Sequence, residues 1–163
     1  MKHTLSILVD NEPGVLSRVA GLFSGRGFNI ESLCVAETLD PKISCITLVT
    51  SGDEKIMEQI IKQLRKLINV IKVMDLSQME SVNREMALIK VKADSSSRAE
   101  ILRIVDIFRG KVVDVSHSHY TIEVTGDEKK LQAIIDLLKP FNIREIVRTG
   151  AVAMARERKE VGR

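Results

Sequence analysis

The chain has 163 residues, a formal net charge of +3, 44% hydrophobic residues and 3% aromatic residues, which suits one globular domain or two small ones. No run of about 18 apolar residues occurs, and the N-terminus has no apolar signal core. We therefore expect neither a membrane span nor export, and a cytoplasmic protein in which Cys34 and Cys45 are reduced and unbonded.

The net charge is concentrated at the C-terminal end. Residues 144–163 contain six Arg or Lys against three Glu, which accounts for the whole +3. The rest of the chain is balanced and poor in aromatic residues, so no general polyanion surface and no nucleic-acid partner is expected. The run Arg156-Glu157-Arg158-Lys159-Glu160 is interpreted as a polar chain end rather than a nucleic-acid contact.

The first elements are a strand over about 3–10 and a helix over about 14–25, joined by a turn. Alternating apolar residues predict the strand, and apolar residues at helical spacing predict the helix, which Gly25 and Gly27 end. In the turn, Asn11 is expected to cap the helix, Pro13 fits its first turn, and Gly14 lets a ligand approach the main chain. Free N–H groups and the helix dipole then favour a small carboxylate, although ordinary turn chemistry explains the same residues.

The remaining elements repeat this order. Strands are predicted over 28–37 and 43–51, a helix over 53–66 and a strand over 69–77. The motif Ser51-Gly52-Asp53-Glu54-Lys55 returns as Thr125-Gly126-Asp127-Glu128-Lys129 within a second set of elements. That set comprises strands over 85–93, 111–116, 119–125 and 143–148, and helices over 97–109 and 127–138.

Two tandem units of βαββαβ order predict an α+β fold of two ferredoxin-like domains. The expected boundaries are 1–77 for the first domain, 78–83 for a linker and 84–163 for the second domain with its basic tail. Each unit of about 75 residues has a small core and a sheet face without helices, so association with another copy is expected.

A second polar position supports a binding site in the first unit. Asn29 opens the strand over 28–37, which this topology is expected to place near the Asn11–Gly14 turn. An amide both donates and accepts hydrogen bonds, so it can bridge the carboxylate and the ammonium of an amino acid. The alternative is that Asn29 only starts the strand.

Catalytic and metal-binding patterns are missing. No phosphate loop, nucleophile elbow or dinucleotide fingerprint occurs. His117 and His119 share one side of a strand but lack further ligands, so a solvated hairpin is the favoured interpretation.

The segments 11–18 and 22–33 resemble the N-terminal ACT domain of the small regulatory subunit of acetolactate synthase (acetohydroxyacid synthase). The resemblance extends to Arg84-Glu85, to 107–115 and to 145–150, and so covers nearly the whole chain. It implies a noncatalytic subunit that activates the thiamine-diphosphate-dependent catalytic subunit and confers feedback inhibition by valine or another branched-chain amino acid. It also implies that this chain holds no cofactor, whereas the catalytic subunit holds thiamine diphosphate and magnesium, with FAD as a further candidate.

The resemblance implies an effector site between two ACT domains of a homodimer, formed by Asn11, Gly14, Val15, Leu16, Asn29 and Ile30. Cys34 stands where other members carry Thr, so the preferred amino acid stays open. The alternative is a free-standing amino-acid sensor that controls transcription or another enzyme. A transcriptional sensor would need a DNA-binding element, and no helix-turn-helix pattern is present.

Overall fold

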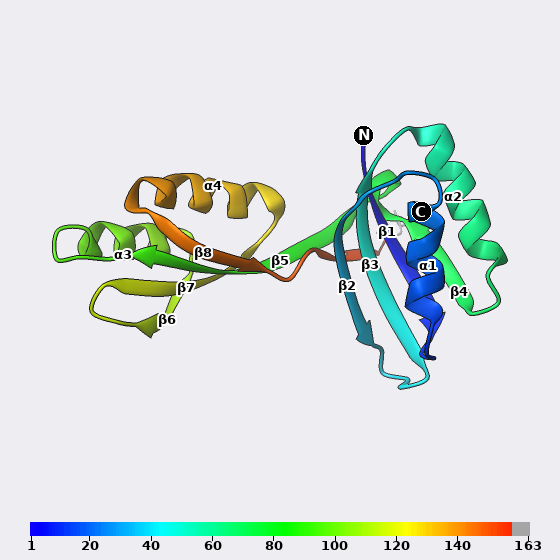
Figure 1. Cartoon of the computed structure of the whole chain (residues 1–163), viewed down its shortest axis with the longest axis horizontal. Coiled ribbons are helices and arrows are strands. Elements are labelled where there is room, and N and C mark those ends of the chain that lie inside the picture. The colour runs from blue at the N-terminus through cyan, green and yellow to red at the C-terminus, as the bar shows by residue number, and fades with distance from the viewer. Residues whose placement is uncertain (158–163) are drawn as a thin grey trace, which may run out of the picture. The chain divides into compact units, whose positions relative to one another are not determined.

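A computed structural model describes residues 1–157, which form two compact units (Figure 1). The first unit comprises Met1–Val82 together with 151–157, and the second comprises Asn83–Gly150. The predicted α+β fold of two ferredoxin-like βαββαβ units is confirmed. No helix in the described part of the chain is long and apolar enough to cross a membrane.

The first unit is a four-stranded antiparallel sheet with two helices on one face (Figure 1). Its sheet order is β2-β3-β1-β4, so β1 and β2 run parallel on either side of β3. The alternating apolar residues of β1 and β3 meet the apolar stripes of α1 and α2 in one core that contains Leu5, Ile46, Phe23 and Leu64. In chain order its elements are β1 (Lys2–Asp10), α1 (Val15–Ser24), β2 (Ile30–Glu37), β3 (Ile43–Ser51), α2 (Glu54–Lys66) and β4 (Val70–Asp75).

The second unit repeats this arrangement with the sheet order β6-β7-β5-β8. Its core is separate and is built around Ile89, Ile104, Ile122 and Leu131. Its elements are β5 (Ser81–Lys92), α3 (Arg98–Ile107), β6 (Lys111–Val115), β7 (His119–Gly126), α4 (Glu128–Leu138), the short 3-10 helix η2 (Lys139–Phe141) and β8 (Ile143–Arg148).

A last strand, β9 (Val152–Ala155), was not predicted. It pairs with β5, and the Arg156 N–H donates to the Glu80 carbonyl oxygen at 2.8 Å. Residues 151–157 therefore group with the first unit, whereas the sequence assigned 84–163 to the second domain. The expected linker 78–83 contains the end of the 3-10 helix η1 (Leu76–Gln78) and the start of β5. The tail residues Arg158, Lys159, Glu160 and Arg163 lie outside the described residues.

The repeated motif begins the second helix of each unit. The Asp53 carboxylate accepts a hydrogen bond from the Lys55 N–H at 2.7 Å, and the Asp127 carboxylate accepts one from the Lys130 N–H at 2.8 Å. Each aspartate therefore satisfies an N–H group that has no partner within the helix. A Cβ atom at Gly52 would overlap the Phe28 ring, which explains why glycine precedes this cap.

Removing either cap should destabilise the protein by a similar amount. Asp53→Ala and Asp127→Ala should each lower the free energy of unfolding by about 1 kcal/mol. Urea titration measures both, with Lys129→Ala, an exposed position in the first turn of α4, as the control. Equal stability of the cap variants and the control would contradict the capping role.

Candidate effector site

The turn between β1 and α1 is held by main-chain hydrogen bonds to two other loops. The Asp10 N–H donates to the Asn69 carbonyl oxygen and the Asn11 N–H donates to the Lys42 carbonyl oxygen, both at 2.8 Å. Gly14 follows with φ +85°, a left-handed conformation that favours glycine, and it is the N-cap of α1. A Cβ atom at Gly14 would have no heavy atom within 4 Å, so the turn is open on this side.

The turn leaves amide groups available to an anion. The i to i−4 hydrogen bonds of α1 begin at Arg18, whose N–H donates to the Gly14 carbonyl oxygen at 3.1 Å. In the part of the chain that the structure describes, the amides of Gly14, Leu16 and Ser17 have no main-chain acceptor. Three unpaired N–H groups at the positive end of a helix form the kind of site that the sequence predicts for a carboxylate.

Asn11 has a different role from the predicted one. Its side-chain N–H groups donate to Glu37 Oε1 at 3.1 Å and to the Pro41 carbonyl oxygen at 2.9 Å. The expectation that Asn11 caps α1 was wrong, because α1 begins four residues later, at Val15, and its N-cap is Gly14, which has no side chain. Pro13 likewise precedes the cap and lies outside the first turn. Asn11 instead joins the turn to the end of β2.

The apolar neighbours of Gly14 differ in exposure. Val15 is 3% exposed and belongs to the core, so it offers the turn only its main chain. Leu16 is 41% exposed and presents its side chain to solvent. Of these two side chains, only that of Leu16 is therefore accessible to a ligand at the turn.

Asn29 and Ile30 lie at the opposite end of the sheet from Asn11. Ile30 pairs with Thr50, which pairs with His3 at the start of β1, and the Asn29 carbonyl oxygen accepts a hydrogen bond from Thr50 Oγ1 at 2.7 Å. From His3 to Asn11 is eight residues, or about 26 Å at roughly 3.3 Å per residue. The expectation that Asn29 lies near the Asn11–Gly14 turn was wrong for two residues of the same chain. β1 and β2 run in the same direction, so Asn29, which precedes β2, lies at the end of the sheet where β1 starts, whereas the turn follows the end of β1.

The Asn29 end of the sheet carries its own charged group. Ser51 donates a hydrogen bond to Glu31, and the Lys2 ammonium lies 3.5 Å from Glu31 Oε2. The hydrogen bond from Ser51, followed by the charge of Lys2, lowers the pKa of the Glu31 carboxyl. Glu31 is therefore an anion at neutral pH and lies two residues along the chain from Asn29.

His119, at the start of β7, has polar neighbours on both ring nitrogens. His119 Nδ1 is hydrogen-bonded to Ser118 Oγ at 2.7 Å, and its Nε2 lies 3.1 Å from Arg144 Nε. Among residues 1–157, no group of three His, Cys, Asp or Glu side chains is placed to hold a metal ion. Cys34 and Cys45 are free thiols, as expected, and both are half-buried.

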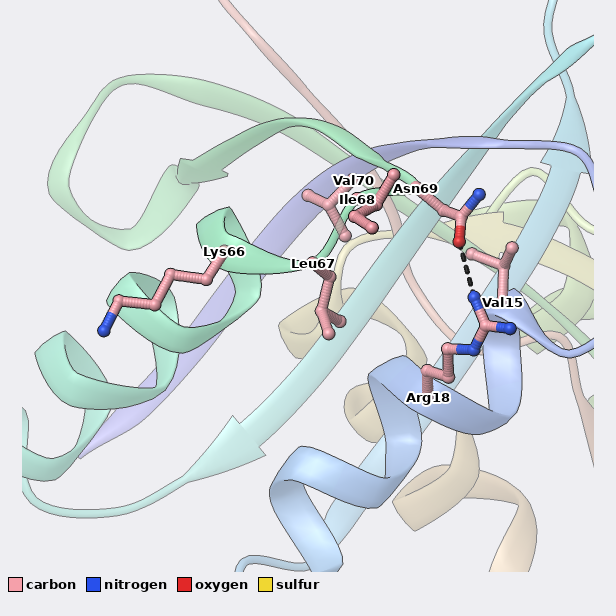
Figure 2. Close-up of a pocket in the computed structure, with 7 residues that line it drawn as sticks. All are labelled: Val15, Arg18, Lys66, Leu67, Ile68, Asn69 and Val70. Carbon is pink, nitrogen blue, oxygen red and sulfur yellow. Dashed lines mark hydrogen bonds between the residues drawn. The ribbon is translucent and has the colours of Figure 1, made fainter.

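A side-chain network that the sequence did not reveal joins Asn69 to α1 and to the turn before it. Figure 2 shows the hydrogen bond of this network between Arg18 and Asn69. The Asn69 side-chain oxygen accepts a hydrogen bond from Arg18 Nη1 at 2.6 Å, and its nitrogen donates to Asp10 and Glu12, each at 3.3 Å. Asn69 lies in the turn between α2 and β4, 51 residues from Arg18. The sequence placed Asn69 at the start of the strand predicted over 69–77, and it gave no sign of these partners because they are distant in the chain.

The sheet order β2-β3-β1-β4 and the glycine turn before α1 define an ACT-type domain, a class of regulatory module. A family model described as an AHAS small subunit-like ACT domain matches residues 5–72, and one described as the small subunit of acetolactate synthase matches residues 84–157. The chain belongs to the acetolactate synthase small-subunit family.

Individual relatives cover nearly the whole chain. The acetolactate synthase small subunit of Aquifex aeolicus is 57% identical over 96% of this chain and 82% of its own length. A probable small subunit of Archaeoglobus fulgidus is 53% identical over 98% of this chain and 100% of its own. The crystal structure of the small subunit from Thermotoga maritima superposes with a TM-score of 0.87 at 46% identity, covering 97% of this chain and 99% of that one.

Proposed function

We propose that this chain is the noncatalytic regulatory subunit that activates a thiamine-diphosphate-dependent acetolactate synthase and makes it sensitive to inhibition by valine or another branched-chain amino acid. The observation that carries the proposal is the Asn11–Gly14 turn, with its left-handed glycine and unpaired amides, in a chain of this family. The amides would hold the effector carboxylate, and the reaction would take place on the catalytic subunit with its thiamine diphosphate and magnesium, with FAD as a further candidate. Both subunits would be cytoplasmic.

The separation of Asn11 from Asn29 supports a site shared by two copies. Within the described residues 1–157, β2 is an edge strand that pairs with β3 alone in its sheet. If two copies pair antiparallel through β2 about a two-fold axis, the start of β2 in one copy lies beside the end of β2 in the other. Asn29 of one copy then lies beside the Asn11–Glu37 contact of the other.

The shared site assigns a role to each predicted residue. Gly14 and the main chain of Val15 and Leu16 would bind the effector carboxylate. Asn11 and Asn29, from different copies, would bind its polar groups. The side chains of Leu16 and Ile30 would contact its apolar side chain. Pairing the edge strands also covers the main-chain groups of β2 that would otherwise remain open to aggregation.

Reconstitution tests the proposal. The isolated protein, supplied with thiamine diphosphate and magnesium, should form no acetolactate from pyruvate. Added to the catalytic subunit from the same cell, it should increase turnover, and valine should reverse part of that increase. Acetolactate formation by this chain alone, or unchanged turnover on mixing, would refute the proposal.

A further inference from the structure

A buried histidine lies at the same end of the first unit's sheet as Asn29. His3 is 1% exposed and belongs to β1, where it shares the helix-covered face with Leu5, two residues further on. Both of its ring nitrogens are buried, and neither has a hydrogen-bond partner among residues 1–157. A buried polar group without a partner costs free energy and is rare in native structures, so packing alone does not explain a histidine here.

His3 lies between polar side chains of the two neighbouring strands. Its Nδ1 atom lies 3.6 Å from Oδ2 of Asp75, the last residue of β4, and this distance is too long for a hydrogen bond. On β3 its pairing partner is Thr50, a fully buried residue whose side chain lies on the same face. A displacement of about 0.7 Å would bring Nδ1 to the ordinary hydrogen-bond distance of about 2.9 Å from Asp75.

The two neighbours of His3 connect different parts of the chain. Thr50 Oγ1 donates the 2.7 Å hydrogen bond to the Asn29 carbonyl oxygen, so it holds the main chain of a predicted effector residue. The Asp75 carboxylate accepts hydrogen bonds from the N–H and the hydroxyl of Ser77 in η1, which is followed by β5 of the second unit. A row of side chains therefore runs from Asn29 to η1, with His3 at its middle.

We infer that His3 is a positioning residue for the effector: binding at Asn29 displaces Thr50 and closes a hydrogen bond between His3 and Asp75, which carries the change to η1. The inference rests on the proposed function and adds to it the route from the effector site to the segment that precedes the second unit. A buried contact with two discrete arrangements is the physical requirement for such coupling. Because the bond forms only in the bound state, it strengthens effector binding.

Two substitutions at His3 in the full-length protein separate coupling from packing. His3→Leu has a similar volume and no polar atom, so its urea midpoint should equal or exceed that of the unsubstituted protein, while calorimetry should show valine binding weakened about fivefold or more. His3→Asn keeps a nitrogen donor near the place of Nδ1 but leaves empty space, so its urea midpoint should fall while valine affinity stays within about twofold. His117→Leu, the same change at an exposed histidine, should alter neither quantity.

Nuclear magnetic resonance of the histidine rings gives a readout from the unsubstituted protein itself. Valine should shift the ring signals of His3 and leave those of His117 unchanged, because only His3 gains a hydrogen bond. The exchange of the Ser77 N–H, which donates to Asp75, should slow at the same time. A histidine that only fills space would keep the same ring signals with and without valine.

The outcomes separate this inference from the proposed function. If the unsubstituted protein binds none of valine, leucine and isoleucine, the proposed function fails and the coupling with it. If it binds valine while the His3 ring signals stay unchanged, or if His3→Leu binds valine with unchanged affinity, the proposed function stands and the role of His3 is refuted. If His3→Leu does not fold, the ring signals of the unsubstituted protein decide the question.

Discussion

Gly14→Asp is expected to abolish inhibition by valine while the reconstituted enzyme remains activated. The new carboxylate would point into the open side of the turn, where no heavy atom lies within 4 Å, and would repel the effector carboxylate. Aspartate tolerates the left-handed conformation of this position better than most residues, so the fold should survive. Loss of a charge-assisted hydrogen bond costs about 1.5–3 kcal/mol, which corresponds to roughly 10- to 100-fold more valine at half-inhibition.

Asn29→His should also abolish inhibition by valine, because it removes a side-chain amide that both donates and accepts hydrogen bonds. A valine titration of the reconstituted enzyme measures both variants, beside activation without valine. Ser24→Asp adds the same charge at the far end of α1 and should leave inhibition unchanged. Wild-type half-inhibition in both Gly14→Asp and Asn29→His would show that the site lies elsewhere.

Val35→Pro should convert the protein from a dimer to a monomer and abolish inhibition with it. The Thr38 N–H donates inward to the Ile43 carbonyl oxygen, so the alternation of β2 directs the Val35 N–H away from β3. Proline at this edge position removes only a donor that faces outward, so the sheet of one copy should remain intact. A second copy that pairs antiparallel with β2, however, would lose the hydrogen bond from the Val35 N–H and would clash with the proline ring.

Sedimentation at micromolar concentration measures the oligomeric state. Val35→Thr keeps the main-chain donor and a β-branched side chain, and it should remain a dimer that binds valine. A Val35→Pro monomer that still binds valine with unchanged affinity would contradict a site shared between two copies.

Much of the fold could be predicted because its signals are local. The apolar alternation of β1 and the apolar stripe of α2 each occupy one continuous segment, and the motif at Asp53 and Asp127 fixes the start of a helix in both units. β9 could not be predicted in this way. Its four residues, Val-Ala-Met-Ala, carry little pattern, and the strand exists because the chain returns to pair with the start of β5, about 70 residues earlier.

The candidate site was predictable in its residue types but not in its arrangement. The Pro-Gly turn indicated a helix start with open amides, and Gly14 has that role. The partners of Asn11 could not be predicted, because Glu37 and Pro41 come from a different part of the chain. The position of Asn29 depends on the parallel course of β1 and β2, which follows from the sheet order rather than from any motif.

Mixing two variants that have each lost valine binding tests the shared site most directly. Gly14→Asp and Asn29→His each damage both sites of a homodimer, but a dimer of one with the other has one site with both changes and one with neither. After subunit exchange at equal concentrations, half of the dimers should be mixed, so calorimetry should detect about one quarter of the sites binding valine with wild-type affinity. If Asn29 and Gly14 of the same chain formed the site, mixing would restore no binding, and the account would be contradicted.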